Sequence, residues 1–182
     1  SQEQFDNTAG IVMTAPGTTS KDIDGNNLYA GNITIPVVVT DTYAGIRSIE
    51  WSIRAPQDSN ANQSGTIVVD NAGNSSENNW RVTSFDRNLA TCVEGAIIIN
   101  ANSNAIVVDV KMTNRAGYVT TQSMTVSIDK TTPVVEISFD NEQGDATYTE
   151  YFAESRTAAI TVKERNFDEA GVSLDISNTE GN

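Results

Sequence analysis

The chain has 182 residues, with 11 basic and 24 acidic side chains, a formal charge of −13, no histidine and one cysteine. This acidity argues against nucleic acid or an anionic membrane as a partner, because both need a basic footprint. Without histidine, the Ser-His-Asp and Cys-His nucleophile arrangements and the commonest zinc ligand are excluded. No apolar run approaches the length of about 18 residues that a membrane-spanning helix needs, so membrane insertion is not expected.

Short segments in which apolar and polar residues alternate recur along the chain. In chain order, they cover residues 33–40, 49–54, 106–113 and 124–129. Each alternation predicts a half-buried strand with one face toward a core. Clusters of Gly, Asn, Asp and Ser separate these segments and favour turns. Many short strands with regular turns predict an all-β antiparallel sandwich.

Two local features qualify this prediction. Pro36 lies inside the clearest strand, and because proline cannot donate to a ladder, we expect an edge position or a bulge there. Residues 84–92 and 166–170 are the segments where short helical turns are expected.

The chain also repeats itself at an offset of about 125 residues. Ile35 matches Ile160, and Gly45 matches Gly171. The repeat predicts a first domain at residues 1–132 and an incomplete second unit at residues 133–182, limited to its first three strands. Half a sandwich exposes an apolar face and unpaired strand edges. We therefore expect a second molecule to complete the partial unit, as a homodimer.

Several stretches resemble bacterial immunoglobulin-like repeats of Gram-positive cell-surface and secreted proteins. VDVKMTNRAG at 108–117 and VSIDKTTP at 126–133 are similar to the closing strands and the joint of such repeats. Residues 40–51 look like the passage from strand B to strand C, and residues 133–175 are similar to a further module. The pattern departs from the family at Asn114, Arg115 and Tyr118, and residues 56–104 match nothing in it.

The resemblance implies an immunoglobulin-like antiparallel β-sandwich followed by a partial second immunoglobulin-like unit (strands A to C). It also implies an extracellular location, at the bacterial cell surface or secreted, and a non-catalytic structural or spacer role that supports adhesion. The partners would then be other domains of the same chain. The alternative is a module that binds a glycan or a host protein through the insertion at residues 56–104.

Asp22, Asp24 and Asn26 place several oxygen atoms within a few residues, as calcium loops do. The glycine falls fourth instead of sixth, so a solvated turn is the better interpretation and calcium is the alternative. The acidic clusters at residues 140–145 and 164–169 are likewise interpreted as solvated surface segments, with a calcium site as the alternative. No cofactor is expected.

Four aromatic residues are candidates for core or ligand roles. Trp51 lies on the same face of its predicted strand as Ile49 and Ile53 and is therefore expected in the core. Trp80 follows a polar stretch and either packs or forms a ligand-binding platform. Tyr118 and Tyr43, both in turn regions, are lesser ligand-binding candidates.

Catalysis is not expected from this sequence. Glycoside hydrolysis needs two carboxylates across a cleft, and 24 acidic residues single out no pair. An isopeptide crosslink, which some surface modules form, needs a buried lysine. The alternation places Lys111 and Lys163 on the solvent-facing side of their strands, and Lys21 lies in a loop, so no crosslink is expected. Cys92 is expected as a small buried hydrophobic residue.

Overall fold

The computed structural model of the protein describes residues 9–139 and 157–174. The chain divides into two compact units, Ser1–Lys130 and Thr131–Asn182. Regular structure in the described residues consists of β-strands and two short 3₁₀ helices. Among these residues, no helix is long and apolar enough to cross a membrane.

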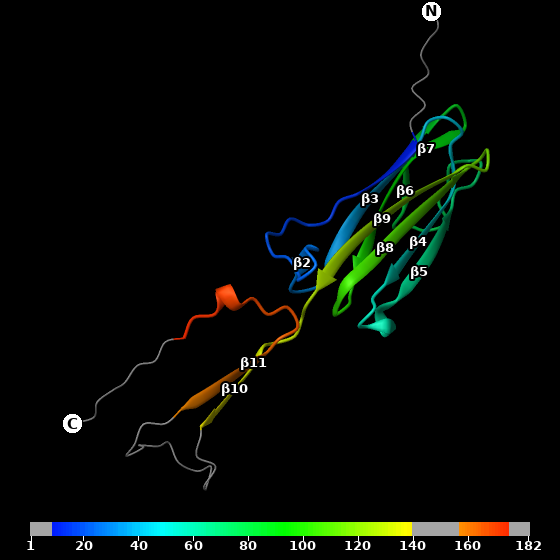
Figure 1. The fold of residues 1–182 in the computed structure, drawn as a ribbon. Helices are drawn as coiled ribbons and strands as arrows, with labels where there is room; N and C mark the ends of the chain where they lie inside the picture. The colour runs from blue at the N-terminus through cyan, green and yellow to red at the C-terminus, as the bar shows by residue number, and fades with distance from the viewer. Residues whose placement is uncertain (1–8, 140–156, 175–182) are drawn as a thin grey trace, which may run out of the picture. The chain divides into compact units, whose positions relative to one another are not determined.

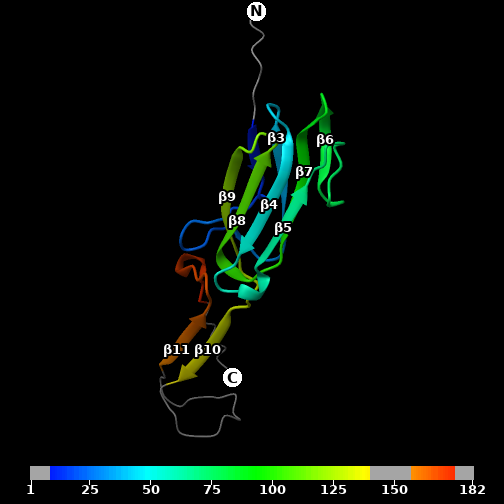
Figure 2. The same ribbon diagram turned by 90° about the vertical axis from the view of Figure 1, so that its right-hand side faces the viewer.

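Unit 1 is a β-sandwich of two sheets (Figures 1 and 2). The first sheet has the order β1 (Ala9–Met13), β3 (Ile33–Asp41), β7 (Leu89–Ile99) and β6 (Arg81–Asp86). The second has the order β2 (Leu28–Tyr29), β9 (Val119–Ile128), β8 (Ser103–Asn114), β4 (Ile46–Arg54) and β5 (Gln63–Val68). All neighbouring strands are antiparallel except β2 and β9, which run parallel. The 3₁₀ helix η1 (Ser59–Ala61) precedes β5.

The core lies between the two sheets, where the alternation places the apolar face of each long strand. Ile35, Val37 and Val39 of β3 are fully buried, and Val108 and Met112 of β8 are buried in the opposing sheet. Full burial of one such side chain contributes about 1.5–3 kcal/mol. The expected all-β sandwich is confirmed.

The expectation of an edge position or a bulge at Pro36 is wrong. β3 is an inner strand, and its pairing with β7 runs through Pro36↔Ala96 without a register shift. The carbonyl of Pro36 accepts a hydrogen bond from Thr14 N at 3.1 Å, immediately after β1 ends at Met13. The amide nitrogen of a strand residue faces the same edge as its carbonyl. The missing donor of Pro36 therefore faces the end of β1, where the ladder stops.

The expected helical turn at residues 84–92 is also wrong, because this segment forms a β-hairpin. β6 and β7 pair down to Asp86↔Leu89, and Arg87 and Asn88 connect them with φ values of 52° and 62°. Positive φ at both central residues is the mark of a type I′ turn, whose usual Asn-Gly signature is absent here. At residues 166–170, the expected turn overlaps the 3₁₀ helix η2 (Glu169–Gly171).

The chain enters unit 1 at one end and leaves it at the other (Figure 1). Ala9, the first residue of β1, pairs with Asp41 at the end of β3 that leads into the β3–β4 turn. Ile128, the last residue of β9, pairs with Ser103 at the opposite end of the second sheet. A module with this path can be linked in series with others.

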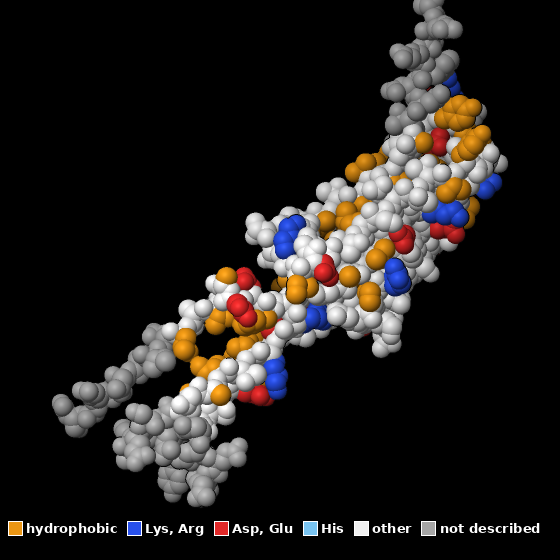
Figure 3. All heavy atoms as spheres, in the orientation of Figure 1, with side chains coloured by type: hydrophobic (Ala, Val, Ile, Leu, Met, Phe, Trp, Pro, Cys, Tyr) orange, Lys and Arg blue, Asp and Glu red, His pale blue; other side chains and the backbone are white. Residues whose placement is uncertain are grey.

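Unit 2 contains an antiparallel pair, β10 (Val134–Phe139) and β11 (Ala158–Lys163), followed by η2. Hydrophobic side chains are visible on its surface (Figure 3). The sequence analysis expects three strands in the second unit, but after β11 the described residues 164–174 contain no strand, and the following residues lie outside the described part of the chain.

Candidate functional site

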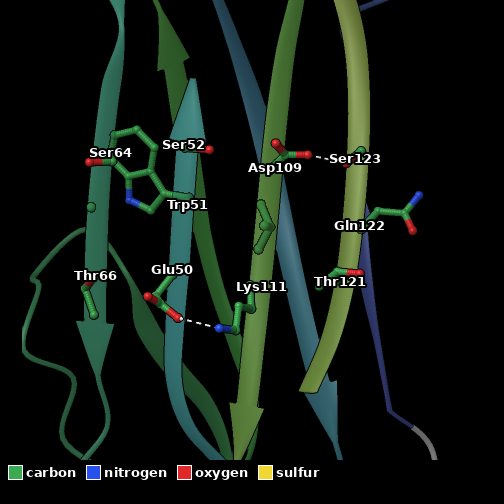
Figure 4. A pocket seen from close by; sticks show the side chains of 12 residues that line it. Glu50, Trp51, Ser52, Ser64, Thr66, Asp109, Lys111, Thr121, Gln122 and Ser123 are labelled. Atoms are coloured by element: carbon green, nitrogen blue, oxygen red, sulfur yellow. Dashed lines mark hydrogen bonds and ion pairs between the residues drawn. The ribbon is translucent and has the colours of Figure 1, made fainter. Parts of the chain in front are cut away.

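A polar groove of about 740 Å³ lies on the outer face of the second sheet, across β9, β8, β4 and β5 (Figure 4). The register aligns its side chains in two rows that cross all four strands. The first row is Ser123, Asp109, Ser52 and Ser64, and the second is Thr121, Lys111, Glu50 and Thr66. We call these eight residues the polar groove.

Charges and hydroxyl groups within the polar groove are partly paired. Lys111 Nζ lies 3.5 Å from Glu50 Oε2, and both side chains are about half exposed. Ser123 Oγ donates a hydrogen bond to Asp109 Oδ1. An ion pair this exposed contributes little stability, so both charged groups can exchange partners with a ligand at small cost. Donors and acceptors alternate across the surface, which suits a hydroxyl-rich ligand.

Trp51 packs against the core, half-buried, and also lines the pocket that contains the polar groove. It pairs with Gly65 of β5, and a Cβ atom on Gly65 would lie 2.6 Å from Trp51 Nε1. In Figure 4 the indole extends from β4 toward β5. The missing side chain of Gly65 therefore makes room for the ring. Trp51 contacts the core as expected, but it is only half-buried.

Trp80 is 5% exposed and belongs to the core, so it does not form the surface platform considered above. The cause is Gly95, because a Cβ there would lie 2.2 Å from Trp80 Cδ2. The ring fills the space that Gly95 leaves on the inner face of β7. Both tryptophans line a smaller cavity of about 350 Å³ alongside Ile67 and Ile97.

Tyr43 and Tyr118 are 61% and 71% exposed, and neither lines the polar groove. They lie on the β3–β4 and β8–β9 turns, which are held together by two hydrogen bonds. Arg115 N donates to Gly45 O at 3.0 Å, and Asn114 Nδ2 donates to the buried Asp41 Oδ2 at 3.0 Å. The structure thus presents these tyrosines at one end of the sandwich, away from the groove.

The turn at residues 22–26, for which calcium binding was the alternative interpretation, contains a carboxylate whose two oxygen atoms both accept hydrogen bonds. Asp22 Oδ1 accepts from Asp24 N at 3.0 Å and from Asn26 N at 2.8 Å. Asp22 Oδ2 accepts from Asn26 Nδ2 at 3.0 Å and from Ser127 Oγ. These donors occupy the oxygen atoms that a cation would use, which favours a turn at Asp22, Asp24 and Asn26. The carboxylate of Asp22 is buried, however, so the expectation that this turn is solvated is wrong for that residue.

Burial alone would raise the pKa of Asp22, but the hydrogen bonds from Ser127, Asn26 and Asp24 outweigh it and lower the pKa. The same turn occurs at Asp70, where Oδ1 accepts from Ala72 N and Asn74 N at 2.9 and 2.8 Å. There the hydrogen bonds from Asn74 lower the pKa of an exposed carboxyl.

Across the described residues, no group of three or more His, Cys, Asp or Glu side chains is placed to hold a metal ion. Within the acidic cluster at 164–169, Asp168 Oδ1 accepts from Ala170 N at 3.0 Å as a cap of η2. The cluster at 140–145 lies outside the described residues.

The lysines considered for a crosslink are all on the surface. Lys111 lies in the polar groove, Lys163 Nζ lies 3.1 Å from Glu136 Oε1, and Lys21 Nζ donates to Asn27 Oδ1. Cys92 is half-buried in β7 rather than fully buried.

The residues of the polar groove were not predicted from the sequence. Each of them occupies an outward position of an alternating strand, and alternation identifies such positions only as solvent-facing. Their assembly into rows depends on the register of four strands, which the sequence pattern does not specify.

Comparisons with known proteins leave the family open. No family model and no curated protein matches the chain. Among solved structures, the chain is similar to a DUF4466 family protein from Parabacteroides merdae, with 10% identity and a TM-score of 0.35. The match covers 72% of this chain and spans about half of that structure, 47% of its length. At this level of similarity, the match supports no conclusion about fold or function.

Proposed function

We propose that the chain is a non-catalytic immunoglobulin-like spacer from a bacterial cell-surface or secreted multidomain protein. The strand order supports the immunoglobulin-like assignment. In that fold, strands A, B, E and D form one sheet, and strands G, F, C and C′ form the other. β1, β3, β7 and β6 occupy the first four positions, and β9, β8, β4 and β5 occupy the second four. The partners in this proposal are the other domains of the same chain.

The end-to-end path of the chain through unit 1 is the observation that carries the spacer role. Near the exit, the last strand is held by parallel pairing to β2. Ser127 N donates to Asn27 O at 2.8 Å, and Asp129 N donates to Tyr29 O at 2.8 Å. Tension applied to the two ends of unit 1 shears these parallel strands along each other, so both hydrogen bonds must break together. Such a module transmits tension and keeps its length.

The extracellular location is supported by composition and by the resemblance of residues 108–117 and 126–133 to surface repeats. A single cysteine suits an oxidising environment in which disulfide exchange would be uncontrolled. A net charge of −13 keeps an extended array soluble.

Asp129→Pro tests the spacer role. Proline removes the N–H that donates to Tyr29 O, so we expect unit 1 to unfold at a clearly lower force when it is pulled from both ends. Asp129→Ala is the matched control, because it removes the same side chain and keeps the N–H. Single-molecule force spectroscopy on the full chain, held by end handles, measures both. Equal unfolding forces for the two variants would contradict the proposed role of the β2–β9 pair.

A second candidate function is glycan binding, and the polar groove favours it. Ser64 and Thr66 bring residues of the 56–104 segment to the groove, beside carboxylates from β4 and β8. Planar carboxylates and hydroxyl groups recognise sugar hydroxyls through paired hydrogen bonds. A host protein remains the other ligand class for the same segment.

A glycan array with the wild type and with a double variant, Glu50→Ala with Asp109→Ala, tests this second candidate. We expect at least a tenfold loss of the bound signal, because two charge-assisted hydrogen bonds at about 1.5–3 kcal/mol each are removed. Thr34→Ala, on the outer face of the other sheet, should keep the signal. A wild type that binds no glycan, or a double variant that binds equally well, would exclude glycan binding in the groove.

A further inference from the structure

The cavity lined by both tryptophans lies at the margin of unit 1, where the two sheets end. β5 is the last strand of the second sheet, and β6 pairs with β7 only as far as Glu94. Ala96 and Ile98 of β7 line the cavity beyond that point, where β6 no longer pairs. We call this space of about 350 Å³ the margin cavity. It is distinct from the larger polar groove, although Trp51 lines both.

The floor of the margin cavity is apolar and aromatic. Ile67, Ile97 and Trp80 are buried there, and Trp51 is half-buried. Apolar side chains around a cavity favour a ligand with an apolar body. Indole is also the aromatic side chain that attracts a cation most strongly, through the negative face of its ring. The floor therefore suits an apolar group that carries a positive charge.

The rim of the margin cavity is polar and carries one charge. Among the described residues that line the cavity, Glu77 alone is charged, whereas Gln63, Thr66 and Asn79 are neutral polar residues; all four are exposed. Within the described part of the chain, no salt bridge or hydrogen bond engages the Glu77 carboxylate. A carboxylate at the rim of an apolar cavity attracts a cation, because no basic side chain along the wall neutralises it.

Hydrogen bonds hold the segment that carries Glu77 in place. Ser76 N donates to Val68 O at 2.9 Å, and Ser76 Oγ accepts from Val68 N at 2.8 Å, so the segment is tied to the edge of β5. Trp80 N donates to Glu77 O at 3.1 Å, which places the carboxylate and the buried indole on one turn. Because the backbone on this side of the cavity is already fixed, little ordering is required when a ligand binds.

We propose that the margin cavity binds a small organic cation that carries a trimethylammonium group. Its methyl groups contact the indoles and the isoleucines, and the Glu77 carboxylate balances its charge. A primary ammonium has three N–H donors that need acceptors, and the apolar side chains of the floor supply none. The volume of about 350 Å³ lies near the lower end for ligand pockets, which suits a small molecule.

Titration of the full chain with choline, followed by intrinsic fluorescence, tests the proposal. The chain has two tryptophans and both line the margin cavity, so the signal reports on the site itself. At an ionic strength held constant with NaCl, we expect a saturable change with a Kd of about 0.1–5 mM, the range for a ligand of so few atoms. The neutral isostere 3,3-dimethyl-1-butanol should bind about fivefold or more weakly, because it lacks the charge.

Three variants separate the charge from the aromatic contact. Glu77→Gln keeps the size of the side chain and removes its charge, so it should raise the Kd of choline about fivefold or more. Glu94→Gln makes the same change on β7 outside the cavity lining and should leave the Kd within about twofold of the wild type. Trp51→Leu should also raise the Kd about fivefold or more, with Trp80 as the remaining reporter and circular dichroism as the check on folding.

Three results would overturn the proposal. The first is a wild type that shows no saturable change up to ~50 mM choline, about tenfold above the expected range. The second is equal binding of choline and of its neutral isostere, because the charge would then not be recognised. The third is an equal effect of Glu77→Gln and Glu94→Gln on the Kd of choline. None of these results bears on the spacer role, which rests on the β2–β9 pair and on the path of the chain.

Discussion

Gly95→Ala is expected to destabilise unit 1 by about 3 kcal/mol, at the upper end for overpacked cores. The new Cβ would lie 2.2 Å from Trp80 Cδ2, so the buried indole has to move. Urea denaturation followed by tryptophan fluorescence and circular dichroism measures the loss. Gly65→Ala is the comparison, because the half-buried Trp51 can swing outward, and we expect a cost of about 1 kcal/mol.

The same pair can be examined in a double-mutant cycle. In a Trp80→Ala background the ring is gone, so adding Gly95→Ala should cost less than about 1 kcal/mol, and the difference measures the coupling. An unchanged cost of Gly95→Ala in that background would show that the steric contact with Trp80 is not the cause.

Asp22→Ala is expected to cost about 3 kcal/mol at neutral pH, because it leaves the buried hydroxyl donor of Ser127 and the partly buried amide donor of Asn26 without an acceptor. The loss should depend on pH. The folded pKa of Asp22 lies below its ordinary value of 3.8, so its contribution is full above that value and disappears as the pH falls through the folded pKa. The pH dependence is best measured with Asp22→Asn, which has no carboxyl group to titrate. The difference in the free energy of unfolding between the wild type and Asp22→Asn should be constant from pH 7 to pH 5 and should shrink below pH ~3.8.

Urea denaturation at several pH values between 7 and 2 measures that gap. Asp70→Ala is the control, since it removes the same turn from an exposed site, and its cost at pH 7 should stay near or below 1 kcal/mol. A gap for Asp22→Asn that widens in acid would contradict the assigned hydrogen bonds.

The strands of unit 1 were predictable because their signal is local. The segments 33–40, 49–54 and 106–113 fall in β3, β4 and β8, and 124–129 extends one residue past the end of β9, with alternation coinciding with one buried face in each strand. The turns at Asp22 and Asp70 also have a local sequence signal, because in each an Asp is followed three residues later by a glycine with positive φ.

The features that sequence reasoning missed depend on partners distant in the chain. The burial of Trp80 follows from Gly95 on another strand. The hairpin at Arg87 lacks the glycine that usually marks a type I′ turn. Pro36 is tolerated in an inner strand because β1 ends beside it. The polar groove exists only in the register of four strands.

Residue-resolved amide hydrogen exchange on the full chain tests the spacer geometry most directly. The amides of Ser127 and Asp129, which donate to Asn27 and Tyr29, should exchange as slowly as the core amides of β8, through global unfolding of unit 1. Exchange of these two amides at the rate of the exposed turns would show that the exit strand is not locked to β2. In that case the β2–β9 pair would not resist tension at the exit of unit 1, and β9 would be held by its ladder to β8 alone.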